Sequence, residues 1–148
     1  MALMTPWKLL LLPLLLLPSG ATQVDSSPVT PVRLVAPFRA PTSAFGPGHR
    51  GVDLAAALGQ SVSSPIAGAI TYRGDVAGRA VITISDGIRT VTVEPVLSAL
   101  SVGTAVFSGQ FLGTVGVGGH CSLRCVHLGL RIAGQYRNPL RLHARLLP

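Results

Sequence analysis

The chain has 148 residues, of which 17 are glycine and 12 are proline, and its formal net charge is +7. A chain of this length supports one domain rather than several. Only 11% of the residues are charged, and no basic helix, finger-like cysteine spacing or aromatic-rich sheet motif accompanies the positive charge. We therefore expect no nucleic-acid partner.

The first 21 residues have the pattern of a secretory signal peptide. Lys8 precedes an apolar run over residues 9–17, and residues 18–21 supply the small side chains at which a signal peptidase cuts. A span across a bilayer takes about 20 apolar residues, so a retained membrane anchor is the weaker alternative. We expect cleavage after Ala21, no stable membrane insertion afterwards, and a mature protein that is secreted or associated with the cell envelope.

The mature chain owes its positive charge to arginine alone. Lys8 is the only lysine, and its removal leaves 11 arginines against five acidic residues, a net charge of +6. Carrier domains that bear biotin or lipoyl groups are excluded, because they need an acceptor lysine. Arginine pairs with carboxylates and phosphates, so the surface could bind an anionic wall polymer. The alternative is a solvated basic face without a partner.

Two regions follow the signal peptide, and the second is rich in predicted strands. Residues 22–44 contain Pro, Ser, Thr and Val and are predicted to be a linker or wrapping arm. Beyond them, short β-branched runs alternate with glycine, at residues 60–64, 69–73, 80–85, 90–93, 104–107, 111–115 and 126–132. Asp86-Gly87 and Ala77-Gly78 are predicted to form hairpin turns. This spacing indicates an all-β fold, a compact antiparallel β-sandwich or open barrel.

Two separated motifs carry the chemistry. Residues 48–54 read Gly-His-Arg-Gly-Val-Asp-Leu and contain His49 and Asp53, and residues 125–129 read Cys-Val-His-Leu-Gly and contain His127. Residues four apart on an extended strand face the same side, so His49 and Asp53 can converge on one ion. Two imidazoles and one carboxylate suit Zn²⁺ and leave a fourth position for water, as in hydrolytic zinc sites.

With the glycines between them, these motifs resemble those of the lysostaphin-type (LytM-like) zinc metallopeptidases. The resemblance covers residues 45 to about 142, within a domain predicted over residues 45–148. It is particularly similar to the secreted actinobacterial branch, in which Gly-His-Cys precedes a Cys-Leu-His-Trp-Gly segment. The matching segments here are Gly119-His120-Cys121 and Cys125-Val126-His127-Leu128-Gly129. The resemblance implies a compact antiparallel β fold, zinc ligation by His49, Asp53 and His127, and cleavage of peptide cross-links in bacterial peptidoglycan.

At two positions the sequence departs from the family's pattern. The first histidine of the family's H-x-H motif is Cys125 here, and the histidine of its Tyr-x-His-Leu segment is replaced by Pro95. Glu94 and His120 are the candidates to replace them in acid and base catalysis. The resemblance therefore supports a secreted zinc metalloendopeptidase. The alternative is a catalytically degenerate domain that binds cell wall or regulates another wall hydrolase.

The two cysteines allow two predictions. In an oxidising compartment Cys121 and Cys125 are expected to form a disulfide that holds the turn leading to His127. Alternatively, Cys125 binds the metal as a thiolate beside His127, which would close a four-ligand structural site. Export favours the disulfide.

Overall fold

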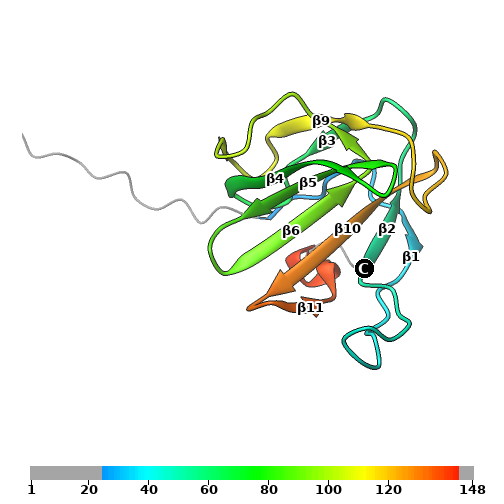
Figure 1. Ribbon diagram of the computed structural model, residues 1–148. Helices are drawn as coiled ribbons and strands as arrows, with labels where there is room; N and C mark the ends of the chain where they lie inside the picture. The colour runs from blue at the N-terminus through cyan, green and yellow to red at the C-terminus, as the bar shows by residue number, and fades with distance from the viewer. Residues whose placement is uncertain (1–24, 144–148) are drawn as a thin grey trace, which may run out of the picture.

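A computed structural model describes residues 25–143 of the chain. Nearly all regular structure in this part of the chain is β-strand (Figure 1), which confirms the predicted fold class. The predicted signal peptide, residues 1–21, lies outside the described residues. Among residues 25–143, no helix is long and apolar enough to cross a membrane.

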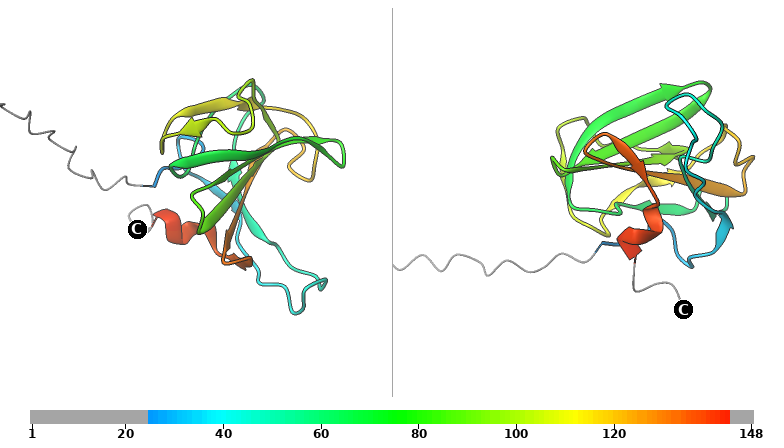
Figure 2. Two further views of the ribbon diagram at one scale, coloured as in Figure 1. Left: turned by 60° about the vertical axis from the view of Figure 1, so that its left-hand side comes forward. Right: turned by 90° about the horizontal axis from the view of Figure 1, so that it is seen from below.

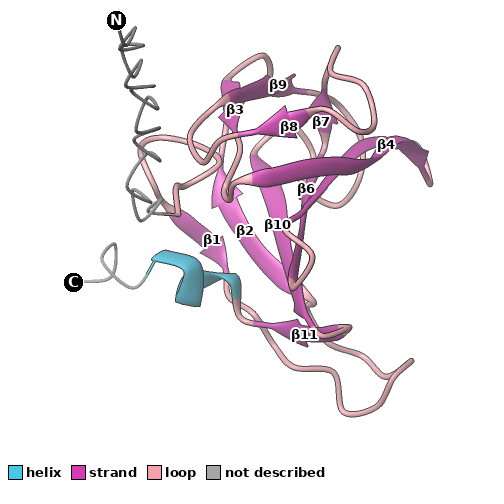
Figure 3. Cartoon of the chain, turned by 90° about the vertical axis from the view of Figure 1, so that its left-hand side faces the viewer, coloured by secondary structure: helices cyan, strands magenta, loops and turns pink. Residues whose placement is uncertain are grey.

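The strands form two antiparallel sheets. The larger, eight-stranded sheet has the order β1 (Leu34–Ala36), β2 (Gly51–Ala55), β10 (Cys125–Ile132), β6 (Arg89–Glu94), β5 (Arg79–Ser85), β4 (Gly68–Val76) and β8 (Ala105–Val106), with β11 (Gln135–Arg137) paired to β10. The smaller, three-stranded sheet has the order β3 (Ser61–Ser63), β9 (Phe111–Val115) and β7 (Val96–Leu97). A short 3-10 helix, η1 (Pro139–His143), follows β11. Figure 3 shows the smaller sheet gathered at one end of the molecule, with β2, β6 and β10 extending away from it.

The alternation of side chains along the central strands separates a core face from an outer face. Val126, Leu128 and Leu130 of β10 are buried in the hydrophobic core, whereas the residues between them point to the other side of the sheet. The neighbouring strands contribute apolar side chains to the same core, among them Val52, Leu54, Ile82, Ile84, Val91 and Val93. Polar side chains on β2, β5, β6 and β10 consequently share the outer face, and the predicted site lies there.

Residues 25–44 wrap against the sheets. Val29 belongs to the core and is 2% exposed, and β1 pairs with β2 along the edge of the larger sheet. The loop that follows β1 projects at the end of the molecule where β11 and η1 lie (Figure 2). An isolated bridge between Arg39 and His49 ties this loop to the start of β2.

Each strand predicted from the sequence is present, with small shifts at its ends. Both predicted hairpin turns are confirmed. Ala77 and Gly78 join β4 to β5 with φ angles of 49° and 77°, and Gly87, with φ of 93°, lies between β5 and β6. The strands β1, β2, β7 and β11 were not predicted from the β-branched runs in the sequence. They are short, or they carry glycine and polar residues that weaken a strand signal.

Candidate metal centre

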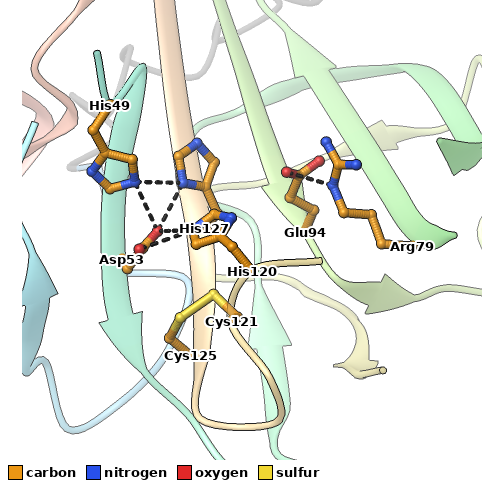
Figure 4. The surroundings of a disulfide bond; sticks show 8 residues. All are labelled: His49, Asp53, Arg79, Glu94, His120, Cys121, Cys125 and His127. Atoms are coloured by element: carbon orange, nitrogen blue, oxygen red, sulfur yellow. Dashed lines mark hydrogen bonds and ion pairs between the residues drawn. A yellow bond between two sulfur atoms is a disulfide. The ribbon is translucent and has the colours of Figure 1, made fainter. Parts of the chain in front are cut away.

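Four side chains from three segments converge on the outer face (Figure 4). His49 precedes β2, Asp53 lies on β2, His127 lies on β10, and His120 lies on the loop that leads to β10. The Oδ1 atom of Asp53 is 3.1 Å from Nε2 of His49 and 2.8 Å from Nδ1 of His127. The two ring nitrogens are 3.2 Å apart. The register of β2 and β10, in which Asp53 and His127 are direct partners, brings these groups together.

The ring of His49 is fixed from behind by the N-terminal arm. Its Nδ1 atom lies 2.7 Å from the carbonyl oxygen of Pro37. A carbonyl can only accept, so Nδ1 carries the proton and donates this bond. In the neutral ring the lone pair is then on Nε2 and points at Asp53 and His127. A hydrogen bond of this kind commonly orients histidines that bind metals.

The backbone of His49 is held as well as its ring. The N–H of His49 donates to the carbonyl of Arg39 at 2.8 Å, and the N–H of Arg39 donates back to His49 at 3.0 Å. Residues before the first motif therefore set both the position and the tautomer of one of its candidate ligands.

The ring of His127 lies directly against Gly51 on the neighbouring strand. A β-carbon on Gly51 would approach Nε2 of His127 to 2.5 Å and Cε1 to 2.6 Å, and it would also collide with the carbonyl oxygen of Leu128. The glycine of the first motif thus makes room for the histidine of the second.

His120 completes the cluster from above the sheet. Its Nε2 atom is 3.0 Å from Oδ1 of Asp53 and 2.9 Å from Oδ2. Gly118 and Gly119 have φ angles of 101° and 71°, and a β-carbon on Gly119 would come within 2.8 Å of Arg79. These glycines let the loop pack closely over the turn that precedes β5, and the packing brings His120 over Asp53.

A disulfide closes this loop. The sulfurs of Cys121 and Cys125 are bonded, and the two Cα atoms are 4.9 Å apart, which confirms the predicted pairing. Neither sulfur is free as a thiolate, so the alternative in which Cys125 ligates the metal is excluded. The crosslink ties the residue after His120 to the first residue of β10, two positions before His127.

The electrostatics of the cluster keep Asp53 charged. Burial of Asp53, a residue that is 4% exposed, raises the pKa of its carboxyl group by itself. Hydrogen bonds with His127 and His120, together with the electrostatic influence of the His120 and His49 rings, outweigh burial and lower the pKa of Asp53 from 3.8 to about 2.

The arrangement fits a zinc ion. Tetrahedral ligation with bonds of about 2.0–2.1 Å places neighbouring donor atoms about 3.3 Å apart. The separations among His49, Asp53 and His127 are 2.8 to 3.2 Å, and the donor atoms of all four side chains lie within 4.8 Å of one another. A lone pair of His49 faces a carboxylate, and a cation between them relieves the repulsion. Imidazole and carboxylate donors are also the chemistry that zinc accepts.

Glu94 lies outside this cluster. It is the register partner of His127 on β6, so both side chains lie on the outer face, but its partner is Arg79, whose Nε atom is 2.8 Å from Oε1 of Glu94. Glu94 is only 8% exposed. The structure thus gathers His49, Asp53, His120 and His127 and places Glu94 beside them, paired with an arginine.

A groove of about 260 Å³ continues from His127 along the outer face. Its walls include Glu94 and Arg79 near the cluster, and Arg131 and Tyr136 farther along. Sequence reasoning assigned no role to Pro37, Gly51 or these arginines. Gly51 belongs to the first motif, but each of these residues acts through a neighbour that is distant in sequence.

The fold and this cluster define a β-sheet domain of the metallopeptidase type. Residues 47–139 match the family described as Peptidase family M23. The match covers more than half of the chain, and the chain belongs to this family. The resemblance to lysostaphin-type peptidases is thereby confirmed.

Two mycobacterial proteins are similar in sequence to this chain. Uncharacterized proteins of Mycobacterium tuberculosis and Mycobacterium bovis are 35% identical over 103 residues, which are 67% of this chain and 41% of theirs. The chain thus spans less than half the length of these curated relatives. The mycobacterial similarity is compatible with the actinobacterial branch.

Solved structures share the fold. Lysostaphin in solution superposes with a TM-score of 0.68 at 20% identity, covering 84% of this chain and 56% of that one. A mutant catalytic domain of the prophage-encoded M23 protein EnpA from Enterococcus faecalis gives 0.65 at 22% identity, covering 78% and 95%. Helicobacter pylori Csd3 gives 0.66 at 26% identity, covering 80% and 34%.

Proposed function

We propose that the chain is a secreted zinc metalloendopeptidase that cleaves peptide cross-links of bacterial peptidoglycan. Family membership supports a zinc metallopeptidase-like domain. One structural neighbour is described as a zinc-containing peptidase from Vibrio cholerae, and lysostaphin is described as an antimicrobial peptidase. The predicted signal peptide and the oxidised cysteine pair support export.

One observation carries the proposal. A lone pair of His49, fixed by the carbonyl of Pro37, meets Nδ1 of His127 and Oδ1 of Asp53 at one point. These three groups would hold the zinc. His120 adds a third imidazole, carried on a loop with its side chain 53% exposed, and its contact with both oxygens of Asp53 orients the carboxylate.

When bound, zinc supplies a Lewis acid that polarises the scissile carbonyl and activates a water. The groove beside His127 would hold an extended peptide against β6 and β10. Glu94 lines this groove and is the register partner of His127 on the adjacent strand β6. It would accept the proton of the attacking water and return it to the leaving amine, while Arg79 orients it.

A second candidate is a degenerate domain that keeps the fold and binds wall peptide or regulates another hydrolase. The observation in its favour is that Cys125 and Pro95 occupy the positions of two family histidines, and the disulfide removes Cys125 from any proton transfer. A structural neighbour, with a TM-score of 0.67 at 18% identity, is described as part of the SpoIIQ–SpoIIIAH pore-forming complex. Domains of this fold thus also occur in assemblies.

Zinc content and peptidoglycan turnover distinguish the two candidates. The secreted chain would be measured for zinc by mass spectrometry and for release of peptides from purified peptidoglycan, with and without chelator. His49→Ala is the variant expected to lose both properties. One zinc per chain with chelator-sensitive release supports the enzyme. One zinc without release supports the binding module, and no zinc overturns the zinc enzyme.

Export and domain limits belong to the same proposal. We propose cleavage after Ala21, a wrapping arm over residues 22–44, a peptidase domain over residues 45–148, and attraction of the 11 arginines to anionic wall polymers. The mass of the mature chain, recovered from the culture medium, tests the cleavage. Retention on wall stripped of its polymers, compared with intact wall, tests the attraction.

A further inference from the structure

The groove carries more positive charge than the proposed chemistry uses. Arg50, Arg79 and Arg131 line the groove, against a single acidic residue, Glu94. Glu94 is committed to Arg79. Within residues 25–143, ion pairs engage Arg79 and Arg89 among the arginines, so Arg50 and Arg131 have no carboxylate partner there.

These two arginines are arranged around one aromatic ring. The guanidinium carbon of Arg131 lies 5.0 Å from the centroid of the Tyr136 ring, and that of Arg50 lies 5.6 Å from it. Stacking on an aromatic ring orients a guanidinium while leaving its N–H donors in the plane available. Arg50 is further anchored, because it donates to the carbonyls of Ala44 and Gly46.

We infer that Arg131, with Arg50 beside it, forms a subsite for a free carboxylate on the peptide that occupies the groove. This inference rests on the proposed function and specifies its substrate class, a peptide with a carboxylate near the scissile bond. A planar guanidinium matches a carboxylate with two parallel hydrogen bonds, and a carboxamide cannot replace the charge.

The geometry sets where that carboxylate lies. His127 and Arg131 are on the same face of β10 and four residues apart, about 13 Å along a strand. Because an arginine side chain shortens this distance, the carboxylate falls roughly two to four residues from the scissile bond of an extended peptide. An amidated cross-link would leave both arginines without a partner, so the subsite distinguishes the two forms.

Binding without cleavage tests the subsite. A synthetic cross-link peptide, prepared with a free carboxylate and as the carboxamide, would be titrated by calorimetry into the secreted chain in chelator, where metal-dependent cleavage is absent. The carboxylate form is expected to bind about tenfold more tightly. Arg131→Gln should remove the preference and Arg131→Lys should restore part of it, because lysine keeps the charge without the planar fork.

Arg33→Gln is the matched control, since it makes the same charge change at an exposed arginine that does not line the groove. Equal binding of the two peptides, or an equal effect of Arg33→Gln, overturns the subsite. A third outcome also overturns the subsite: neither peptide binds, and polyglycerol phosphate binds tightly in a way that depends on Arg131.

Hydrolysis by the zinc-loaded chain separates the two proposals. Cleavage of both peptides at the same rate, unaffected by Arg131→Gln, overturns the subsite and leaves the peptidase intact. A binding preference that depends on Arg131, with no cleavage of either peptide, supports the subsite and overturns the peptidase.

Discussion

The imidazole ring of His127 occupies the space that any side chain on Gly51 would need. A β-carbon at Gly51 would lie 2.5 Å from Nε2 of this ring, closer than non-bonded atoms can approach. The same β-carbon would collide with the backbone carbonyl oxygen of Leu128 on the paired strand, which cannot move without disturbing β2 or β10. A substitution with no ligand chemistry of its own should therefore disrupt the metal site.

We expect Gly51→Ala to weaken zinc binding by tenfold or more, the range found when groups that position metal ligands are changed. Competition with a zinc-binding dye measures the affinity. Gly129→Ala is a matched control, because Gly129 pairs with Gly51 and a β-carbon there would meet no atom closer than 3.8 Å. Equal affinity of the two variants would contradict the steric argument.

The low pKa of Asp53 predicts an acid-dependent contribution to stability in the metal-free chain. A folded pKa of about 2, against 3.8 for the ordinary group, contributes roughly 2 kcal/mol that is present above pH 4 and lost as the pH falls toward 2. Urea unfolding in chelator at pH 5 and at pH 2 measures the difference between the native chain and Asp53→Asn.

That difference should be large at pH 5 and small at pH 2. Asp75→Asn, at an exposed carboxylate on β4, is the control for loss of a charge. A constant difference at both pH values would show that Asp53 acts through its shape rather than its charge.

The disulfide should matter more to the metal than to the fold. Closing a five-residue loop stabilises the folded chain by about 2 kcal/mol in the chain-entropy estimate, yet the loop connects His120 with the strand of His127. The double variant Cys121→Ala/Cys125→Ala avoids new thiol ligands near Asp53. We expect it to remain folded by circular dichroism and to bind zinc at least tenfold more weakly. Unchanged zinc affinity would mean that Gly118 and Gly119 position the loop unaided.

Glu94 lies outside the cluster, so a substitution of Glu94 should impair catalysis without impairing metal binding. Glu94→Gln is expected to keep one zinc per chain and to lower peptidoglycan release about 100-fold or more, as for loss of a general base. Arg79→Gln removes the ion-pair partner and leaves the carboxylate in place. If both variants lose zinc, the predicted separation of metal binding from catalysis is wrong.

The sequence predicted the parts of this site that depend on local spacing. His49 and Asp53 share a short motif, and the run around His127 has strand character, so their meeting on one sheet face followed from the two-residue period. The disulfide followed from the compartment and the spacing of its cysteines. The all-β architecture followed from regular short strands separated by glycine.

What could not be predicted depends on strand order and on backbone atoms. The carbonyl of Pro37 has no side-chain signature, and its bond to His49 exists only because β1 pairs with β2. Arg79 reaches Glu94 because β5 and β6 are neighbours. Tyr136, which the sequence left without a role, contacts the guanidinium groups of two arginines because β11 folds back on β10.

The contact between Pro37 and His49 determines where a fragment with an intact metal site must begin. The family match begins at residue 47, and a fragment cut there would retain all four clustered side chains. It would lack the carbonyl that fixes the tautomer of His49 and the Arg39 backbone that holds its strand. A chain trimmed to the segment that matches the family would keep the metal ligands and lose the contacts that position His49. Proteolysis within residues 37–39 would likewise impair the metal centre while leaving all four clustered side chains in place.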